Sequence, residues 1–206
     1  MATTALAIIL LLAGVIVSIV MKQTSAARKA FLPLVLGIAG AVIVTAGACF
    51  TSVPTGHTGV VTTFGRVENY TLDAGIHAKL PWQEVVLLDN RVQKARVELN
   101  CFSSDIQEVK VIYTVNYQIS KENAMTIYSS IGVNYYDTVI TPNVSESVKV
   151  MTARYTAENL VASRDDLSEK IEDLLSEHLS RYNIVVVGTS IEDMDFTDAF
   201  TNAVEA

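Results

Sequence analysis

Acidic residues are missing from the first quarter of this 206-residue chain. All 22 Asp and Glu residues lie after residue 50, and the first 50 residues carry only three charges, Lys22, Arg28 and Lys29. Residues 51–206 carry 12 basic and 22 acidic side chains, a net charge of −10. Soluble domains usually hold about one charged residue in four. We therefore predict an apolar N-terminal region, residues 1–50, followed by one acidic domain, residues 51–195.

Other scarcities exclude whole classes of function. Two cysteines, Cys49 and Cys101, are too few for a disulfide scaffold. The acidic domain has no basic run, which argues against nucleic-acid binding. The sequence contains no phosphate-binding glycine loop, no His-Glu-x-x-His zinc motif and no Gly-x-Ser-x-Gly nucleophile element. We expect no cofactor, no metal and no catalytic residues, and a protein that is not an enzyme.

Two long uncharged runs occupy the N-terminal region: Ala5–Met21, with 17 residues, and Ala30–Phe50, with 21. As helices they would reach about 26 and 31 Å, against about 30 Å of membrane hydrocarbon. The runs predict a transmembrane helical hairpin with a basic loop at residues 22–29. A cleaved signal peptide is the competing interpretation of the first run, but that run lacks a basic start and a clear cleavage site.

The three cations set the expected topology of this hairpin. Lys22, Arg28 and Lys29 all fall in the loop, and the next basic residue is Arg66. The positive-inside rule then places the loop in the cytoplasm and the acidic domain on the non-cytoplasmic side of a bacterial-type inner or plasma membrane. The alternative is a re-entrant wedge with everything on the cytosolic side, which would push three cations into the bilayer.

Small residues recur every four positions along the second run, at Gly37, Ala41, Thr45 and Cys49. Such a stripe lets helix backbones approach closely in lipid. It predicts packing against the first helix or against a neighbouring subunit. The alternative is that the stripe reflects the ordinary richness of membrane helices in small residues.

The acidic domain changes from strand patterns to helix patterns along its length. Residues 108–118 alternate apolar and polar side chains, which is typical of a half-buried strand. Further strands are expected at residues 59–64, 75–80, 85–88 and 183–190. Helices are expected after caps at Ser120, Thr141 (followed by Pro142) and Ser163, and a last helix is expected to start in residues 196–206. This order predicts an α+β domain with a mainly antiparallel sheet.

Five short motifs occur in an order that resembles one known family. They are Val53–Val61, Gly75–Trp82, Ser103–Val109, Ile131–Tyr136 and Phe196–Ala206. Together they resemble the SPFH (band 7) domain of stomatins, prohibitins and flotillins, and prohibitins in particular.

The resemblance implies a non-enzymatic membrane scaffold. Its implied partners are other copies of the chain, in a large ring or cage, then membrane lipids, and a membrane-bound AAA protease that some family members restrain. Two features depart from prohibitins: there are two apolar runs instead of one, and the chain ends where the family continues into a coiled coil. A membrane-bound hydrolase or protease subunit, or a monomeric protease accessory protein, is the alternative function.

The remaining candidate groups are weak sites. His57, His77 and His178 are expected to be hydrogen-bonded structural residues. Glu192, Asp193 and Asp195 could bind Ca²⁺, but a solvated strand end is the simpler interpretation.

The single tryptophan supports a sharper hypothesis. Leu80, Pro81 and Trp82 form an apolar loop segment, and tryptophan is enriched at membrane interfaces. We predict that this segment rests against the bilayer. The alternative is a tryptophan in the core or at a subunit interface.

Overall fold

The computed structural model describes residues 2–23 and 31–196 of the chain. It divides into two compact units, Met1–Leu88 and Asp89–Ala206, and each has its own strands and its own buried core.

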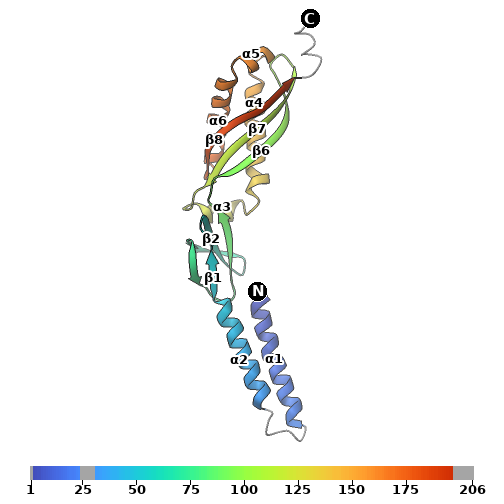
Figure 1. The fold of residues 1–206 in the computed structure, drawn as a ribbon, viewed down its shortest axis with the longest axis vertical. Helices are drawn as coiled ribbons and strands as arrows, with labels where there is room; N and C mark the ends of the chain where they lie inside the picture. The colour runs from blue at the N-terminus through green and yellow to red at the C-terminus, as the bar shows by residue number, and fades with distance from the viewer. Residues whose placement is uncertain (1, 24–30, 197–206) are drawn as a thin grey trace. The chain divides into compact units, whose positions relative to one another are not determined.

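The first unit begins with two helices, α1 (Ala2–Gln23) and α2 (Phe31–Ala48), which pack side by side as a hairpin (Figure 1). None of the helices in the described residues is both long and apolar enough to cross a membrane. The second helix ends earlier than predicted. Phe50 already belongs to strand β1 (Phe50–Val53), because its backbone pairs with Ala78 on β4 (Gly75–Ala78).

A second small sheet completes this unit. Its strands are β2 (His57–Thr63), β3 (Arg66–Leu72) and β5 (Gln83–Asp89), in the order β3-β2-β5. Val53, Val61 and Leu72 are buried together, with Val85 packed against them. Gly59 allows this packing, since a Cβ there would lie 2.7 Å from Cγ1 of Val85.

The second unit is built on an antiparallel sheet of β6 (Gln93–Phe102), β7 (Glu108–Ile119) and β8 (Ile184–Phe196), in the order β6-β7-β8. The central strand β7 buries its apolar face almost completely, which confirms the alternation seen in the sequence. The residues on that face are Val109, Val111, Tyr113, Val115, Tyr117 and Ile119.

The second unit also has helices between β7 and β8. They are α3 (Ala124–Ser130), the π-helix η2 (Tyr136–Ile140), α4 (Thr141–Thr152), α5 (Ala157–Ala162) and α6 (Arg164–Ser180). In Figure 1, α4 and α6 lie along the sheet, and both contact its strands. The contacts come from residues one turn apart on α6, all fully buried: Leu167, Ile171, Leu175 and Leu179. The mixed α+β class with antiparallel pairing is thus as predicted.

Several predicted boundaries are wrong. Thr141 does not cap a new helix, because it already has helical dihedral angles and η2 runs directly into α4. Asn123, not Ser120, holds the cap position of α3, and Ser163 precedes α6 without a side-chain capping bond. Strand β8 continues to Phe196 because β7 is long enough to pair with it. The rest of the predicted last helix, residues 197–206, lies outside the described residues.

Candidate functional site

The segment Leu80–Trp82 forms a tight turn at the edge of the β3-β2-β5 sheet. The Gln83 N–H donates to the Leu80 carbonyl at 3.0 Å, which closes a four-residue turn. Pro81 occupies the second position of this turn, where its restricted φ is favourable. Leu80 and Trp82 therefore point their apolar side chains outward, 48% and 39% exposed.

Gln83 holds this turn against the neighbouring hairpin. Its side chain is buried, and its Oε1 accepts a hydrogen bond from the Leu80 N–H at 2.9 Å. Its Nε2 donates to Oγ1 of Thr63 at 3.3 Å and to the hydroxyl of Tyr70 at 3.2 Å. A buried amide that lost these partners would be costly, so Gln83 fixes where Leu80 and Trp82 lie.

Lys79 connects the same turn to the end of α2. Its N–H donates to the Cys49 carbonyl at 2.7 Å, and its Nζ donates to the Gln83 carbonyl at 2.8 Å. Cys49 directly follows α2. The exposed turn therefore lies next to the point where the second apolar helix ends.

A further apolar residue, Phe64, is exposed in the neighbouring turn between β2 and β3. Phe64 and Gly65 form the two-residue turn between β2 and β3, with φ of +50° and +84°. Turns with two positive φ values strongly prefer Asn-Gly, and a bulky residue at positive φ is rare. Phe64 is nevertheless present and 71% exposed. Phe64 follows Thr63, the residue bonded by Gln83. We refer to the exposed residues Phe64, Leu80 and Trp82 together as the apolar rim.

The predicted small-residue stripe divides into two parts. A Cβ on Gly37 would lie 3.1 Å from the Gly14 Cα and the Leu10 carbonyl oxygen, so α1 and α2 approach closely at this glycine. Ala41 is buried, and Oγ1 of Thr45 donates to its carbonyl at 2.7 Å. Ala41, Thr45 and Cys49, with residues of both helices, line an apolar groove of about 480 Å³.

The topology-setting cations are only partly placed. Lys22 belongs to α1. Arg28 and Lys29 lie outside the described residues.

Of the predicted acidic cluster, Glu192 is the centre of an ion-pair group on the outer face of the β6-β7-β8 sheet. Lys94 and Arg96 on β6 contact the Glu192 carboxylate at 2.7 and 2.8 Å, and the Thr114 hydroxyl donates to it at 2.8 Å. These bonds lower the pKa of Glu192 to about 2. Since Glu192 already has cationic partners, the cluster does not resemble an open calcium site.

Residues 51–206 match the sequence model of the SPFH domain / Band 7 family. The chain belongs to this family. Among its curated relatives is prohibitin-1, mitochondrial, from Arabidopsis thaliana, 32% identical over 64% of this chain and 46% of the relative. Prohibitin 1 of Mus musculus is 29% identical over 84% and 63%, and prohibitin-2 of Saccharomyces cerevisiae is 29% identical over 89% and 60%. The chain spans about half to two thirds of the length of these relatives.

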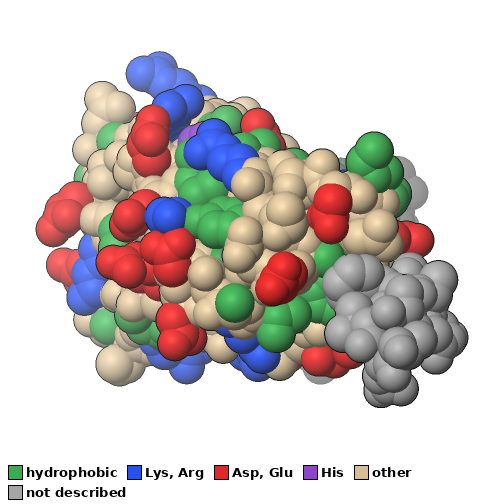
Figure 2. All heavy atoms as spheres, turned by 90° about the horizontal axis from the view of Figure 1, so that it is seen from above, with side chains coloured by type: hydrophobic (Ala, Val, Ile, Leu, Met, Phe, Trp, Pro, Cys, Tyr) green, Lys and Arg blue, Asp and Glu red, His purple; other side chains and the backbone are tan. Residues whose placement is uncertain are grey.

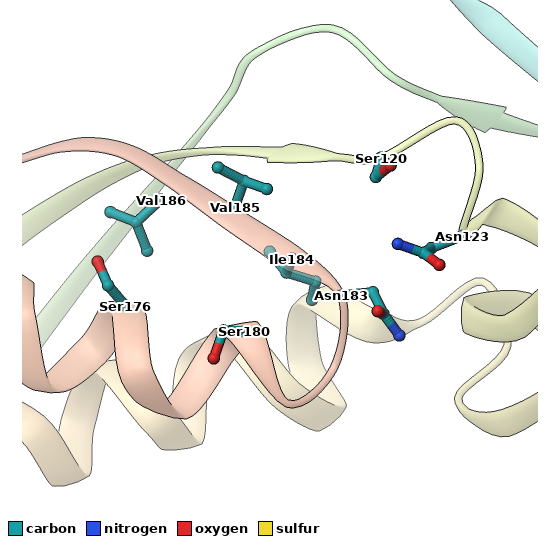
Figure 3. Close-up of a pocket in the computed structure, with 8 residues that line it drawn as sticks. All are labelled: Ser120, Asn123, Ser176, Ser180, Asn183, Ile184, Val185 and Val186. Atoms are coloured by element: carbon teal, nitrogen blue, oxygen red, sulfur yellow. The ribbon is translucent and has the colours of Figure 1, made fainter.

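One pocket of the second unit is lined by uncharged side chains. This pocket, shown in Figure 3, has about 430 Å³, and its walls come from the loop before α3, the end of α6 and the start of β8. Ser120, Asn123, Ser176, Ser180 and Asn183 supply its polar atoms, and the rest is aliphatic. None of these side chains can act as a general acid or base near neutral pH.

Surface charge is mixed, and the described histidines differ in their hydrogen bonding. On the face drawn in Figure 2, acidic and basic side chains are interspersed, with apolar side chains between them. The rings of His57 and His77 lie 3.4 and 2.7 Å from the backbone carbonyls of Thr55 and Asp73. Nδ1 of His178 is buried without a hydrogen-bond partner, so the predicted hydrogen bonding is wrong for this nitrogen. Among the residues that the structure describes, no three His, Cys, Asp or Glu side chains gather as metal ligands would.

Phe64 and Gln83 are not among the residues predicted from the sequence. For Phe64 a signal existed, since Phe-Gly stands between two runs of β-forming residues where Asn-Gly is expected. For Gln83 there was none, because its partners Thr63 and Tyr70 lie 20 and 13 residues away.

Proposed function

We propose that this SPFH chain is a non-enzymatic membrane scaffold that associates with copies of itself. Family membership and the prohibitin relatives support the class of function. The observation that carries the proposal is the continuous exposure of apolar side chains on the α1–α2 hairpin. They include Leu6, Ile8, Ile9, Leu12, Ile16 and Ile19 on α1, and Leu32, Leu36, Val42 and Ile43 on α2.

An apolar surface of this extent needs an apolar environment, because exposed patches beyond a few hundred Å² are rare on soluble proteins. In the proposal, the hairpin lies in the bilayer, and α1 and α2 pack against each other through the close approach at Gly37. The basic segment with Lys22, Arg28 and Lys29 faces the cytoplasm, and the SPFH region lies on the other side.

The apolar rim of Phe64, Leu80 and Trp82 is the second membrane contact in this proposal. Lys79 ties the rim to the end of α2, which is where the bilayer surface would be. Arg66 follows the Phe64 turn, so a cation accompanies the apolar residues on each of the two turns. Aromatic side chains with nearby Lys or Arg suit the headgroup region of a membrane.

Assembly follows from confinement. Copies held in one membrane plane meet at high effective concentration, so modest contacts per subunit close a large ring or cage. Such a ring encloses a patch of membrane and any client within it. By likeness to the family, the proposed client class is a membrane-bound AAA protease.

The tryptophan tests the rim directly, since Trp82 is the only one in the chain. In liposomes the full chain should show a blue-shifted Trp82 emission that lipids with brominated acyl chains quench. Phe64→Ser should weaken this quenching by removing the neighbouring contact. Val187→Ser is the matched control, because Val187 is an exposed apolar residue of the second unit. Equal shielding of Trp82 in lipid-free protein would show that the rim is a protein contact.

The size of the extracted particles tests whether the chain assembles into large oligomers. Extraction of the full chain in mild detergent, followed by light scattering and electron microscopy, should give particles of many copies. A single chain in its micelle would contradict the scaffold proposal and favour the monomeric accessory protein.

A further inference from the structure

The two outer strands of the β6-β7-β8 sheet differ in regularity. Strand β8 pairs with β7 through two register shifts, at Ile112/Tyr113 and at Asn116/Tyr117. Strand β6 pairs with β7 residue for residue over all ten of its positions. Bulges twist an edge strand and protect it from pairing with another chain. One edge of the sheet has this protection and the other lacks it.

The outer side of β6 is available for pairing. In the described part of the chain, no strand pairs with β6 on the side away from β7. Along β6, Ala95, Val97, Leu99 and Cys101 are buried, while Lys94, Arg96, Glu98 and Asn100 lie exposed on the other face. An edge of this kind carries a row of unpaired N–H and C=O groups.

Charges of one sign often protect an edge strand, but β6 carries both signs on its exposed face. A row of like charges repels a second copy of the same strand, whereas opposite charges directly across two strands attract. The order Lys94, Arg96, Glu98, Asn100 is close to self-complementary when read in reverse. This order favours a second copy of the same strand as the occupant of the edge.

We propose that β6 of one copy pairs antiparallel with β6 of a second copy, with Val97 facing Val97 on a two-fold axis. In this register Arg96 faces Glu98 of the second copy and Glu98 faces its Arg96, while Lys94 faces Asn100. One neighbouring register that keeps the same face outward places Arg96 opposite Arg96, although it also places Lys94 opposite Glu98. The other places Glu98 opposite Glu98. Of these three registers, the proposed one alone has opposite charges facing each other and no like-charge pair, and in it the sheet becomes continuous through six strands.

The contacts already present within one chain leave the necessary atoms free. Arg96 reaches Glu192 through Nε, and its terminal nitrogens remain for a second carboxylate. Glu98 contacts Lys110 through Oε1 at 2.6 Å, and its Oε2 can accept from a second guanidinium. Each charged residue can thus serve both its own chain and the second copy.

This inference names the partner surface for the self-association proposed above, and it rests on that proposal. One strand pair buries less area than a standard stable interface, so membrane confinement is needed to populate it. A two-fold contact uses the same patch on both copies and pairs them. A ring then forms from such pairs through a second contact.

Cysteine pairs test the register. Full chains carrying Cys49→Ser, with either Arg96→Cys or Glu98→Cys, would be co-expressed under different tags and oxidised mildly in native membranes. Positions directly opposite in an antiparallel pair have Cα atoms about 4.5–5.5 Å apart, within reach of a disulfide. We expect a covalent dimer that contains both tags. Either variant alone should not form it, because identical positions are diagonal, about 7–8 Å apart.

The opposite edge supplies the control. Asp193→Cys mixed with Asp195→Cys, both on β8, should give no covalent dimer. Absence of the mixed-tag dimer, or equal cross-linking by the single variants, would overturn the β6 contact. If large particles form without the cross-link, β6 pairing is wrong and the scaffold proposal stands. If the cross-linked dimer forms and grows no further, β6 pairing is supported and the ring is wrong.

Discussion

At the scale of single residues, Phe64 is where local stability and proposed function conflict. Its φ of +50° suits asparagine far better than phenylalanine. We predict that Phe64→Asn raises the free energy of unfolding by about 1 kcal/mol, because it relieves the left-handed strain. Denaturant titration in mild detergent, followed by Trp82 fluorescence, measures this change.

Gly65 provides the control for that prediction. Its φ is +84°, so Gly65→Ala should destabilise the same turn. If Phe64→Asn proved as destabilising as Gly65→Ala, the aromatic side chain would contribute packing within the fold, and its exposure would not explain its presence.

Glu192 makes the second unit sensitive to acid. Lys94, Arg96 and Thr114 lower its pKa from the ordinary 4.5 to about 2 in the folded protein. Since the folded pKa lies below the unfolded one, these bonds stabilise the fold above about pH 4.5, and the stabilisation disappears as the pH falls towards 2. Glu192→Gln should therefore be less stable than the original protein near pH 7, and the difference should vanish near pH 2.

Denaturation midpoints of both proteins across pH 2 to 7 check this expectation. Glu108→Gln is the matched variant, because it removes a carboxylate from β7 without touching the Glu192 contacts. A difference between Glu192→Gln and the original protein that stays constant with pH would mean that the amide disturbs packing instead of charge.

At the scale of elements, the hairpin depends on one close approach. A side chain at Gly37 would collide with backbone atoms of α1, whereas a Cβ at Gly47 would have nothing within 4 Å. Gly37→Val should cost about 1–3 kcal/mol by overpacking, and Gly47→Val should be nearly neutral. The thermal unfolding temperature in detergent measures both, and equal effects would contradict the packing of α1 on α2.

Elements with strong apolar periodicity could be predicted from the sequence. The predicted bounds of β7 agree with the structure to within one residue, because its buried face is an unbroken row of Val and Tyr. The sequence does not predict strand β6 although its side chains alternate, since Lys, Glu and Asn have low strand propensity and hide the pattern. Strand β3 was missed because most of its residues are exposed, so burial imposes no alternation.

The candidate site was predictable only in part, for a related reason. Pro81 and Trp82 could be predicted from the sequence, because proline favours turns and tryptophan is enriched at membrane interfaces. The turn that carries Pro81 and Trp82 is positioned by hydrogen bonds from Gln83 to residues distant in the sequence. A local sequence pattern cannot predict such bonds. The rim also includes Phe64 only because the β2–β3 turn meets the same edge, which is a property of the sheet.

At the scale of the whole molecule, the charge order on β6 predicts how assembly responds to charge. Glu98→Arg would place Arg96 of one copy opposite the introduced arginine of the second copy, so particles extracted in mild detergent should become smaller. Adding Arg96→Glu restores opposite charges across the strands and should restore particle size. The double variant also loses the ion pair between Arg96 and Glu192 within the chain. Recovery of particle size would therefore occur although the chain has lost a second ion pair.

A mutation that merely destabilised the chain would behave in the opposite way. Two lost ion pairs should then be worse than one, and the double variant would assemble least. Lys110→Gln tests whether loss of the Glu98–Lys110 ion pair alone reduces particle size. It removes the partner of Glu98 within the chain and leaves the charges of β6 unchanged. The proposal expects particles of the original size for Lys110→Gln and for the double variant, and smaller particles for Glu98→Arg alone. This combination of results requires a contact between copies in which residue 96 faces residue 98.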